Sequence, residues 1–214
     1  MEHLGLVHTV AGLTPTFSAL VGELLPDVAT TVIADELLLK RTVRDGVIDD
    51  VTTERLRSHV AALADFGVDA MLVTCSSIGN IVDRIAAESS VPVHRIDRPM
   101  AEAAVMLGAT VGVLATLPTT LAPTTDIVKL SARALDREIE IVPRLCEGAF
   151  AALSSGDPDR HDAMVAGELE RLATAVDVVV LAQASMARIA EGQPTGDTPV
   201  LSSPRMAIER LAAE

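Results

Sequence analysis

The sequence repeats one local pattern at a separation of 107 or 108 residues, and this repetition constrains the chain to an internally duplicated fold. The segments DAMLVTCSSIGNI and DVVVLAQASMARI align at this separation and pair Cys75 with Gln183. The segments LGLVHT and VGVLAT align in the same way and pair Gly5 with Gly112. Because few residues are identical, chance similarity is the alternative. A separation shared by several segments favours duplication.

Length and composition fit two lobes of about 100 residues each, a usual size for domains. The 214 residues are 49% hydrophobic and include no Trp or Tyr. No apolar stretch approaches the roughly 20 residues that a membrane span requires. The N-terminus has no basic segment ahead of its apolar run, so it does not resemble a signal peptide. We therefore expect a cytoplasmic protein without a membrane partner.

The formal net charge of -13 argues against nucleic acid as a partner, because phosphate binding needs clustered Lys and Arg. Aromatic residues, on which bases could stack, make up only 1% of the chain. The acidic surface is expected mainly to keep the protein soluble. Two cysteines in a chain of this length argue against a disulfide scaffold.

Short apolar segments alternate with helical patterns, which predicts βα units and a mostly parallel sheet. The expected strands are residues 4–7, 31–34, 70–74, 91–96, 110–115, 139–142, 178–182 and 200–201. Together with the repeat, they predict an α/β fold with two pseudo-symmetric lobes, each a mostly parallel four-stranded sheet flanked by helices. The expected lobes are residues 1–97 and 98–203, and the last helix, 204–214, is a candidate to return to the first lobe.

Two helix boundaries carry clear signals. Thr52 is expected to cap a helix that Gly67 ends. Asp157 followed by Pro158 is typical of an N-cap and first helical position, and this helix is expected to reach about Thr174.

Polar residues follow several of the expected strands. Ligands of open parallel sheets bind beyond the carboxyl ends of the strands. Cys75, Thr116 and Gln183 stand at such ends, and His8 and Thr9 stand at the end of the first strand. If the two lobes face each other, these ends are expected to meet in one cleft.

Cys75 is the candidate reactive group. It precedes a helix expected to begin near Ser77, where unpaired amide hydrogens favour negative charge and would lower the pKa of a thiol. The alternative is that Cys75 is a small buried hydrophobe, as free cysteines often are. Its hydroxyl-bearing neighbours Thr74, Ser76 and Ser77 favour a functional role.

These segments resemble the aspartate/glutamate racemase superfamily, which includes amino-acid and hydantoin racemases, maleate isomerase and arylmalonate decarboxylase. TCSS at Thr74, ATLPTT at Ala115 and VLAQASM at Val180 stand in the order of that family's active-site loops. The resemblance covers essentially the whole chain. It implies two flavodoxin-like lobes with the active site between them, no cofactor, a small carboxylate as substrate and a possible homodimer.

The resemblance also implies the catalytic residues, because a typical racemase carries one cysteine after the third strand of each lobe. Cys75 matches the first cysteine, whereas Gln183 stands where the second is expected. Glutamine cannot titrate, so we expect an isomerase that works through a single cysteine. Decarboxylation followed by proton delivery, cis-trans isomerisation, and racemisation with a second group remain open. Cys146 could be that second group or a structural residue.

Hydroxyl groups are the expected carboxylate ligands. By the resemblance, Thr116 and Thr119 lie in a threonine-bearing loop that holds a substrate carboxylate, and a turn capping the next helix is the alternative. The other residues expected to bind substrate are His8, Thr9, Ser76, Ser77 and Ser185.

The remaining candidates are weaker. His3, His59 and His94 have no partners at metal-ligand spacing, so no metal is expected. His161 is expected at the surface, and Asp35 could either orient a substrate or cap a helix. A non-catalytic small-molecule sensor, in which Cys75 merely packs, is the alternative from another functional class.

Overall fold

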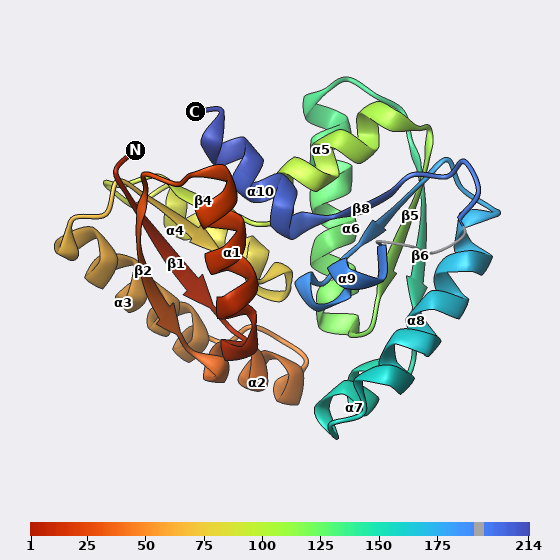
Figure 1. Cartoon of the computed structure of the whole chain (residues 1–214), viewed down its shortest axis with the longest axis horizontal. Coiled ribbons are helices and arrows are strands. Elements are labelled where there is room, and N and C mark those ends of the chain that lie inside the picture. The colour runs from red at the N-terminus through yellow and green to blue at the C-terminus, as the bar shows by residue number, and fades with distance from the viewer. Residues whose placement is uncertain (191–194) are drawn as a thin grey trace. The chain divides into compact units, whose positions relative to one another are not determined.

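A computed structural model describes residues 1–190 and 195–214 of the chain. It divides into two compact units, residues 1–96 with 204–214 and residues 97–203. Each unit contains a parallel four-stranded sheet flanked by helices (Figure 1). The predicted fold class is therefore confirmed. Within the described residues, no helix is long and apolar enough to cross a membrane.

The sheet of the first unit has the strand order β2-β1-β3-β4. Its strands are β1 (His3–His8), β2 (Ala29–Ala34), β3 (Ala70–Val73) and β4 (Val93–Arg95). The helical elements of this unit are η1 (Ala11–Leu13), α1 (Thr14–Leu24), α2 (Glu36–Asp45), α3 (Asp50–Phe66), η2 (Ser76–Ile78), α4 (Gly79–Ala86) and α10 (Ser203–Ala212).

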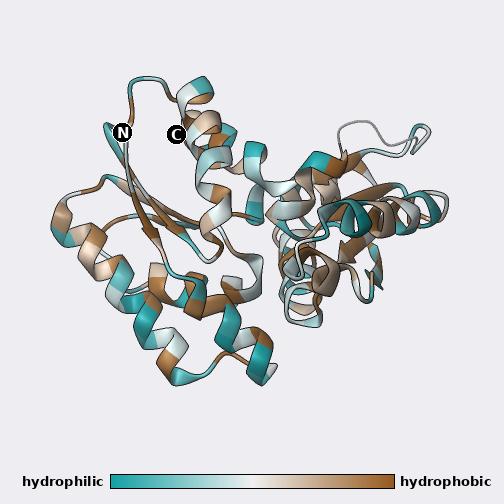
Figure 2. Ribbon diagram, turned by 60° about the horizontal axis from the view of Figure 1, so that its bottom comes forward, coloured by the Kyte–Doolittle hydropathy of each residue, from teal (hydrophilic) through white to brown (hydrophobic). Residues whose placement is uncertain are grey.

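Helices cover both faces of this sheet. On one face, α2, α3 and α4 bury residues such as Leu38, Leu63 and Ile81 in a cluster that also contains Val73. The ribbons show α1 and α10 on the other face (Figures 1 and 2). In Figure 2 the hydrophobic colour concentrates on the strands, while the helices alternate between polar and apolar stretches.

The second unit repeats this arrangement in the order β6-β5-β7-β8. Its strands are β5 (Thr110–Ala115), β6 (Glu140–Leu145), β7 (Val178–Leu181) and β8 (Val200–Ser202). Its helical elements are α5 (Arg98–Leu107), α6 (Pro118–Ala134), α7 (Ala149–Ser154), α8 (Pro158–Ala173), η3 (Ala184–Met186) and α9 (Ala187–Ala190). The helix after β4 thus belongs to the second unit, and most of the helix after β8 belongs to the first.

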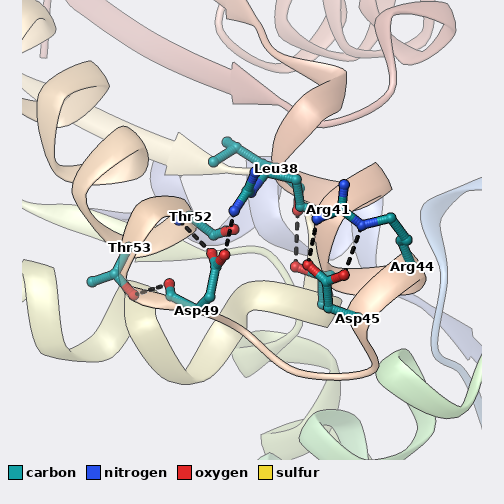
Figure 3. A network of polar contacts seen from close by, with 8 residues as sticks. Leu38, Arg41, Arg44, Asp45, Asp49, Thr52 and Thr53 are labelled. Atoms are coloured by element: carbon teal, nitrogen blue, oxygen red, sulfur yellow. Dashed lines mark hydrogen bonds and ion pairs between the residues drawn. The ribbon is translucent and has the colours of Figure 1, made fainter.

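The predicted start of α3 is wrong by a few residues. Asp49, not Thr52, is the N-cap, and its carboxylate accepts a 2.7 Å hydrogen bond from the N–H of Thr52. The same carboxylate pairs with Arg41 of α2 (Figure 3). A carboxylate is a stronger hydrogen-bond acceptor than a threonine hydroxyl, and it can also form an ion pair with an arginine, which a hydroxyl cannot. At the other end Gly67 stops α3 with a φ of 93°, as predicted.

The other predicted helix start is confirmed. The carboxylate of Asp157 accepts a hydrogen bond from the N–H of Arg160, and Pro158 is the first residue of α8. The strands lie where predicted, with ends displaced by up to three residues, as at β6.

The glycines paired by the repeat allow a helix to approach each sheet closely. A Cβ atom on Gly5 in β1 would lie 3.1 Å from Leu63 Cδ1 in α3. On Gly112 in β5 it would lie 2.9 Å from Leu172 Cδ2 in α8. The repeated glycine therefore has a packing role in both units.

We expect Gly112→Ala to lower the free energy of unfolding by about 1–3 kcal/mol, because the added methyl group overpacks the sheet against α8. Gly5→Ala should cost less, because its neighbours are farther away. Gly22→Ala in α1 is the control: its new Cβ atom would meet nothing within 4 Å, so stability should rise. Urea unfolding measures all three, and an unchanged stability for Gly112→Ala would contradict the packing role.

Candidate active site

Parallel pairing brings the ends of β1 and β3 together. Val7 pairs with Val73, and Thr9 and Cys75 each follow two residues later. Cys75 has an extended backbone and is the N-cap residue of η2. Its side chain is therefore held at the carboxyl edge of the sheet, where parallel sheets bind ligands.

The thiol of Cys75 is surrounded by hydrogen-bond donors. The hydroxyls of Thr9 and Ser77 contact the sulfur, and the backbone N–H groups of Ser77 and Ile78 also donate to it. We call Thr9 and residues 76–78 the thiol cradle. Donors of this kind stabilise the thiolate form.

Burial nevertheless outweighs these donors. Cys75 is only 8% exposed, and it packs in the apolar cluster with Leu38 and Val60. Burial raises the pKa of the thiol, while the bonds from Thr9, Ser77 and Ile78 partly offset that rise. The N–H groups at the helix start lower this pKa, as predicted, but the net pKa is raised because removing the charge from water costs more than the donors of the cradle return.

The helix α2, which packs against η2, is anchored by charged groups. Leu38 of α2 lies in the same cluster as Cys75 and Ile78. The ion pair between Arg41 and Asp49 ties α2 to the start of α3 (Figure 3). This ion pair thus links α2, which contributes to the cluster around Cys75, to the start of α3.

His8 lies beside the cradle residue Thr9 but faces the other way, because side chains alternate along a strand. Its Nδ1 atom lies 2.7 Å from the hydroxyl of Thr74, which itself donates to the carbonyl of Val7. That hydroxyl has one proton, which goes either to the carbonyl of Val7 or to His8 Nδ1, so the tautomer of His8 decides the direction of this bond. The Nε2 atom is buried and has no hydrogen-bond partner in the described part of the chain. His8 packs against Phe17 of α1.

In the second unit, Gln183 stands where Cys75 stands in the first. Its Oε1 atom accepts a 2.7 Å hydrogen bond from the N–H of Thr116, and its Nε2 atom donates a 2.7 Å bond to the hydroxyl of Thr116. Thr116 is the repeat partner of Thr9. The same strand-end pairing therefore joins a threonine to a thiol in one unit and to an amide in the other.

The other residues predicted to bind substrate have different settings. Ser76 is buried in the cradle, and the carbonyl of the half-buried Ser185 accepts a bond from Arg188. The buried hydroxyl of Thr119 has no partner within residues 1–190 and 195–214. The helix α6 has Leu117 as N-cap and no side-chain cap bond, so the threonine-rich turn does not cap it.

Cys146 also stands at a carboxyl edge, because its N–H donates to the carbonyl of Ala115 at the end of β5. Its side chain is 7% exposed and packs with Val165 and Leu169 of α8. Burial and the negative charge of Glu168 raise the pKa of this thiol. These surroundings are those of a structural cysteine.

The sequence did not reveal two polar clusters. Asp35 caps α2 and also binds Arg55 and His59 of α3. In the second unit, the carboxylate of Asp162 in α8 contacts its neighbour His161 and also accepts a hydrogen bond from Arg188 of α9.

His161 was expected at the surface, and this prediction is wrong. Its ring is fully buried because it lies on the inward face of α8, one turn before Val165. No group of three His, Cys, Asp or Glu side chains suited to a metal ion occurs among the residues that the structure describes.

The comparisons with known proteins yield one family model and several solved structures of similar fold. The sequence matches the Asp/Glu/Hydantoin racemase family over residues 7–211. Its fold is similar to a putative Asp/Glu racemase from Yersinia pestis, with a TM-score of 0.74, 14% identity, and coverage of 100% of this chain and 98% of that chain. No curated protein matches the sequence.

Two further solved structures are similar. Glutamate racemase from Bacillus anthracis has a TM-score of 0.72 and 16% identity, with coverage of 99% of this chain and 80% of that chain. Allantoin racemase from Klebsiella pneumoniae has a TM-score of 0.69 and 15% identity, with coverage of 100% and 87%. At these identities the likeness establishes the fold.

We expect Cys75 to titrate above the usual thiol pKa of about 8.5, because burial disfavours the thiolate. Thr9→Val should raise the midpoint further by removing a donor to the sulfur. The measurement is the rate of alkylation by iodoacetamide against pH in a Cys146→Ala background, so that only Cys75 reacts. Thr30→Val, an exposed position on β2, is the control. A midpoint at or below the usual value would contradict the assignment.

A second prediction concerns stability against pH. Burial lowers the pKa of His8 from 6.5 to about 4, so the unfolded chain binds a proton that the folded chain rejects between these values. The free energy of unfolding should therefore fall by about 3 kcal/mol as the pH falls through this window. Urea unfolding across the window measures the fall. His8→Gln should show a smaller fall, and equal slopes would exclude His8 as its source.

Proposed function

The chain belongs to the Asp/Glu/Hydantoin racemase family, and we propose that it is a racemase-type isomerase that acts on a small carboxylate through Cys75. Family membership supports the class of enzyme. The proposal adds the single reactive thiol, the independence from cofactors and the use of Gln183 in substrate binding. Racemases of glutamate and of allantoin are among the structurally similar proteins, so both amino acids and ureido compounds are candidate substrates.

The observation that carries the proposal is the thiol cradle. Two hydroxyls and two backbone N–H groups converge on the sulfur of Cys75 at the carboxyl edge of the sheet. A cysteine that only fills the core needs no such donors, because a thiol is a weak acceptor. Donors fixed in advance stabilise the negative charge that forms on sulfur when its proton leaves.

The chemistry follows from the resting form of the thiol. Because burial raises its pKa, Cys75 begins as a neutral acid that can give its proton to a carbanion on the substrate. The electron pair of the S–H bond then remains on sulfur, where the cradle residues Thr9, Ser77 and Ile78 stabilise it. In the reverse direction the thiolate removes the proton from carbon and becomes neutral again.

Gln183 makes this chemistry one-sided. An amide neither gives nor takes a proton at neutral pH, and both ends of this amide are bonded to Thr116. Gln183 therefore supports a second candidate reaction, decarboxylation of a small dicarboxylate followed by proton delivery from Cys75 to one face. Full racemisation also requires a base on the opposite face to remove the proton that Cys75 replaces, and Cys146, packed against α8, is not proposed for that role.

The test is turnover in deuterated water with amino acids, hydantoins, allantoin, maleate and arylmalonates. Cys75→Ala should lose at least about 10²-fold in rate, because general acid–base catalysis typically contributes 10² to 10⁴. Product from the wild-type protein should carry deuterium on one face only. Gln183→Cys should add exchange on the second face.

Cys146→Ala is the matched control, because it removes the other free thiol and should leave turnover unchanged. A fully active Cys75→Ala variant would exclude the proposed chemistry. Equal deuterium on both faces in the wild-type protein would show a second acid/base group. Carboxylate binding without turnover, equal in wild type and Cys75→Ala, would indicate a sensor.

A further inference from the structure

Arg95 is a buried arginine next to the thiol cradle. It ends β4, and its side chain is 1% exposed. Its Nη1 atom lies 2.7 Å from the carboxylate of Asp83 in α4. The guanidinium also packs against Gly79, the first residue of α4, which directly follows the cradle. A Cβ atom at Gly79 would lie 2.5 Å from Arg95 Cζ and still closer to Nη2, so a side chain there requires the guanidinium or the helix start to move.

The second unit lacks both members of this contact. Arg95 pairs with Val73 in the sheet, and Ser202 pairs with Leu181 in the equivalent register. Gly79 ends η2, and its counterpart at the end of η3 is Ala187. The second unit, with the small residue Ser202 on β8, thus carries the methyl group of Ala187 at the start of α9. The unit with arginine carries none, and it is the unit with Cys75.

Burying Arg95 in the first unit costs free energy, and a small side chain would fill that position without this cost. A guanidinium removed from water loses its hydration, and charged and polar groups must compensate for that loss. A serine fills the equivalent place in the second unit. We propose that Arg95 is a positioning residue for Cys75: by packing against Gly79 and pairing with Asp83, it fixes the first turn of α4 and the N–H donors of the thiol cradle.

The proposal predicts how the thiol responds when the contact is disturbed. A methyl group at Gly79 must displace either the guanidinium of Arg95 or the start of α4 and the cradle with it. The apolar side chains that bury Cys75, such as Leu38 and Val60, come from other helices and remain in place. The sulfur would then lose donors but stay buried, so its titration should move to higher pH.

The test combines Gly79→Ala, Arg95→Ser and the double variant, which together reproduce the residues of the second unit. In the Cys146→Ala background, each single variant should raise the pH midpoint of Cys75 alkylation by about one unit, a roughly tenfold loss of thiolate at a given pH. In the Arg95→Ser background, adding Gly79→Ala should change little, because the obstructing group is gone. Arg84→Ser, at an exposed position of α4, is the control and should keep the wild-type midpoint.

A wild-type midpoint in Gly79→Ala would overturn the proposal, and so would equal effects of Gly79→Ala with and without Arg95. If Arg95→Ser does not fold, Arg95→Lys replaces it. That variant keeps the charge without the planar guanidinium and should also raise the midpoint. The inference deepens the proposed function, but the thiol titration decides it even if no carboxylate is turned over. Where a substrate is found, Gly79→Ala should lower kcat more than it changes KM.

Discussion

The register of parallel strands is the constraint on which the candidate site depends. Because Val7 pairs with Val73, the residues that leave the two strands at the same edge, Thr9 and Cys75, come together. The second unit keeps the same register and brings a threonine to Gln183. A slip of one residue in either sheet would turn these side chains to the opposite face.

The two units place different chemistry on this common framework. Around Cys75 the donors converge on an atom that can gain and lose a proton, whereas the amide of Gln183 satisfies Thr116 and stays neutral. The two units also differ at the following helix start: Arg95 packs against Gly79 in the first unit, whereas Ala187 occupies the equivalent position in the second. The two units thus have equivalent strand ends, and of these two residue pairs only the one in the first unit contains a titratable side chain.

The position of the strands, the class of the fold and the identity of the strand-end residues could be predicted because they depend on local patterns. The alternation of apolar segments and the repeat located each sheet strand to within a few residues. The helix cap at Asp157 was also readable, because the cap and its Pro158 are neighbours in the chain. The cap at Asp49 was not predicted, although its bond to Thr52 is local; its ion pair with Arg41 of another helix could not be predicted from neighbouring residues.

By itself, then, the sequence determined that Cys75 and Gln183 follow equivalent strands of two α/β lobes. Strand periodicity is a property of neighbouring residues, and the repeat can be found by aligning the sequence with itself. Only the tertiary structure decided that the thiol is buried and has a raised pKa, that His8 contacts Thr74, and that Arg95 packs on Gly79. Burial, charge and close contact depend on segments that are distant in the chain and meet only in the folded protein.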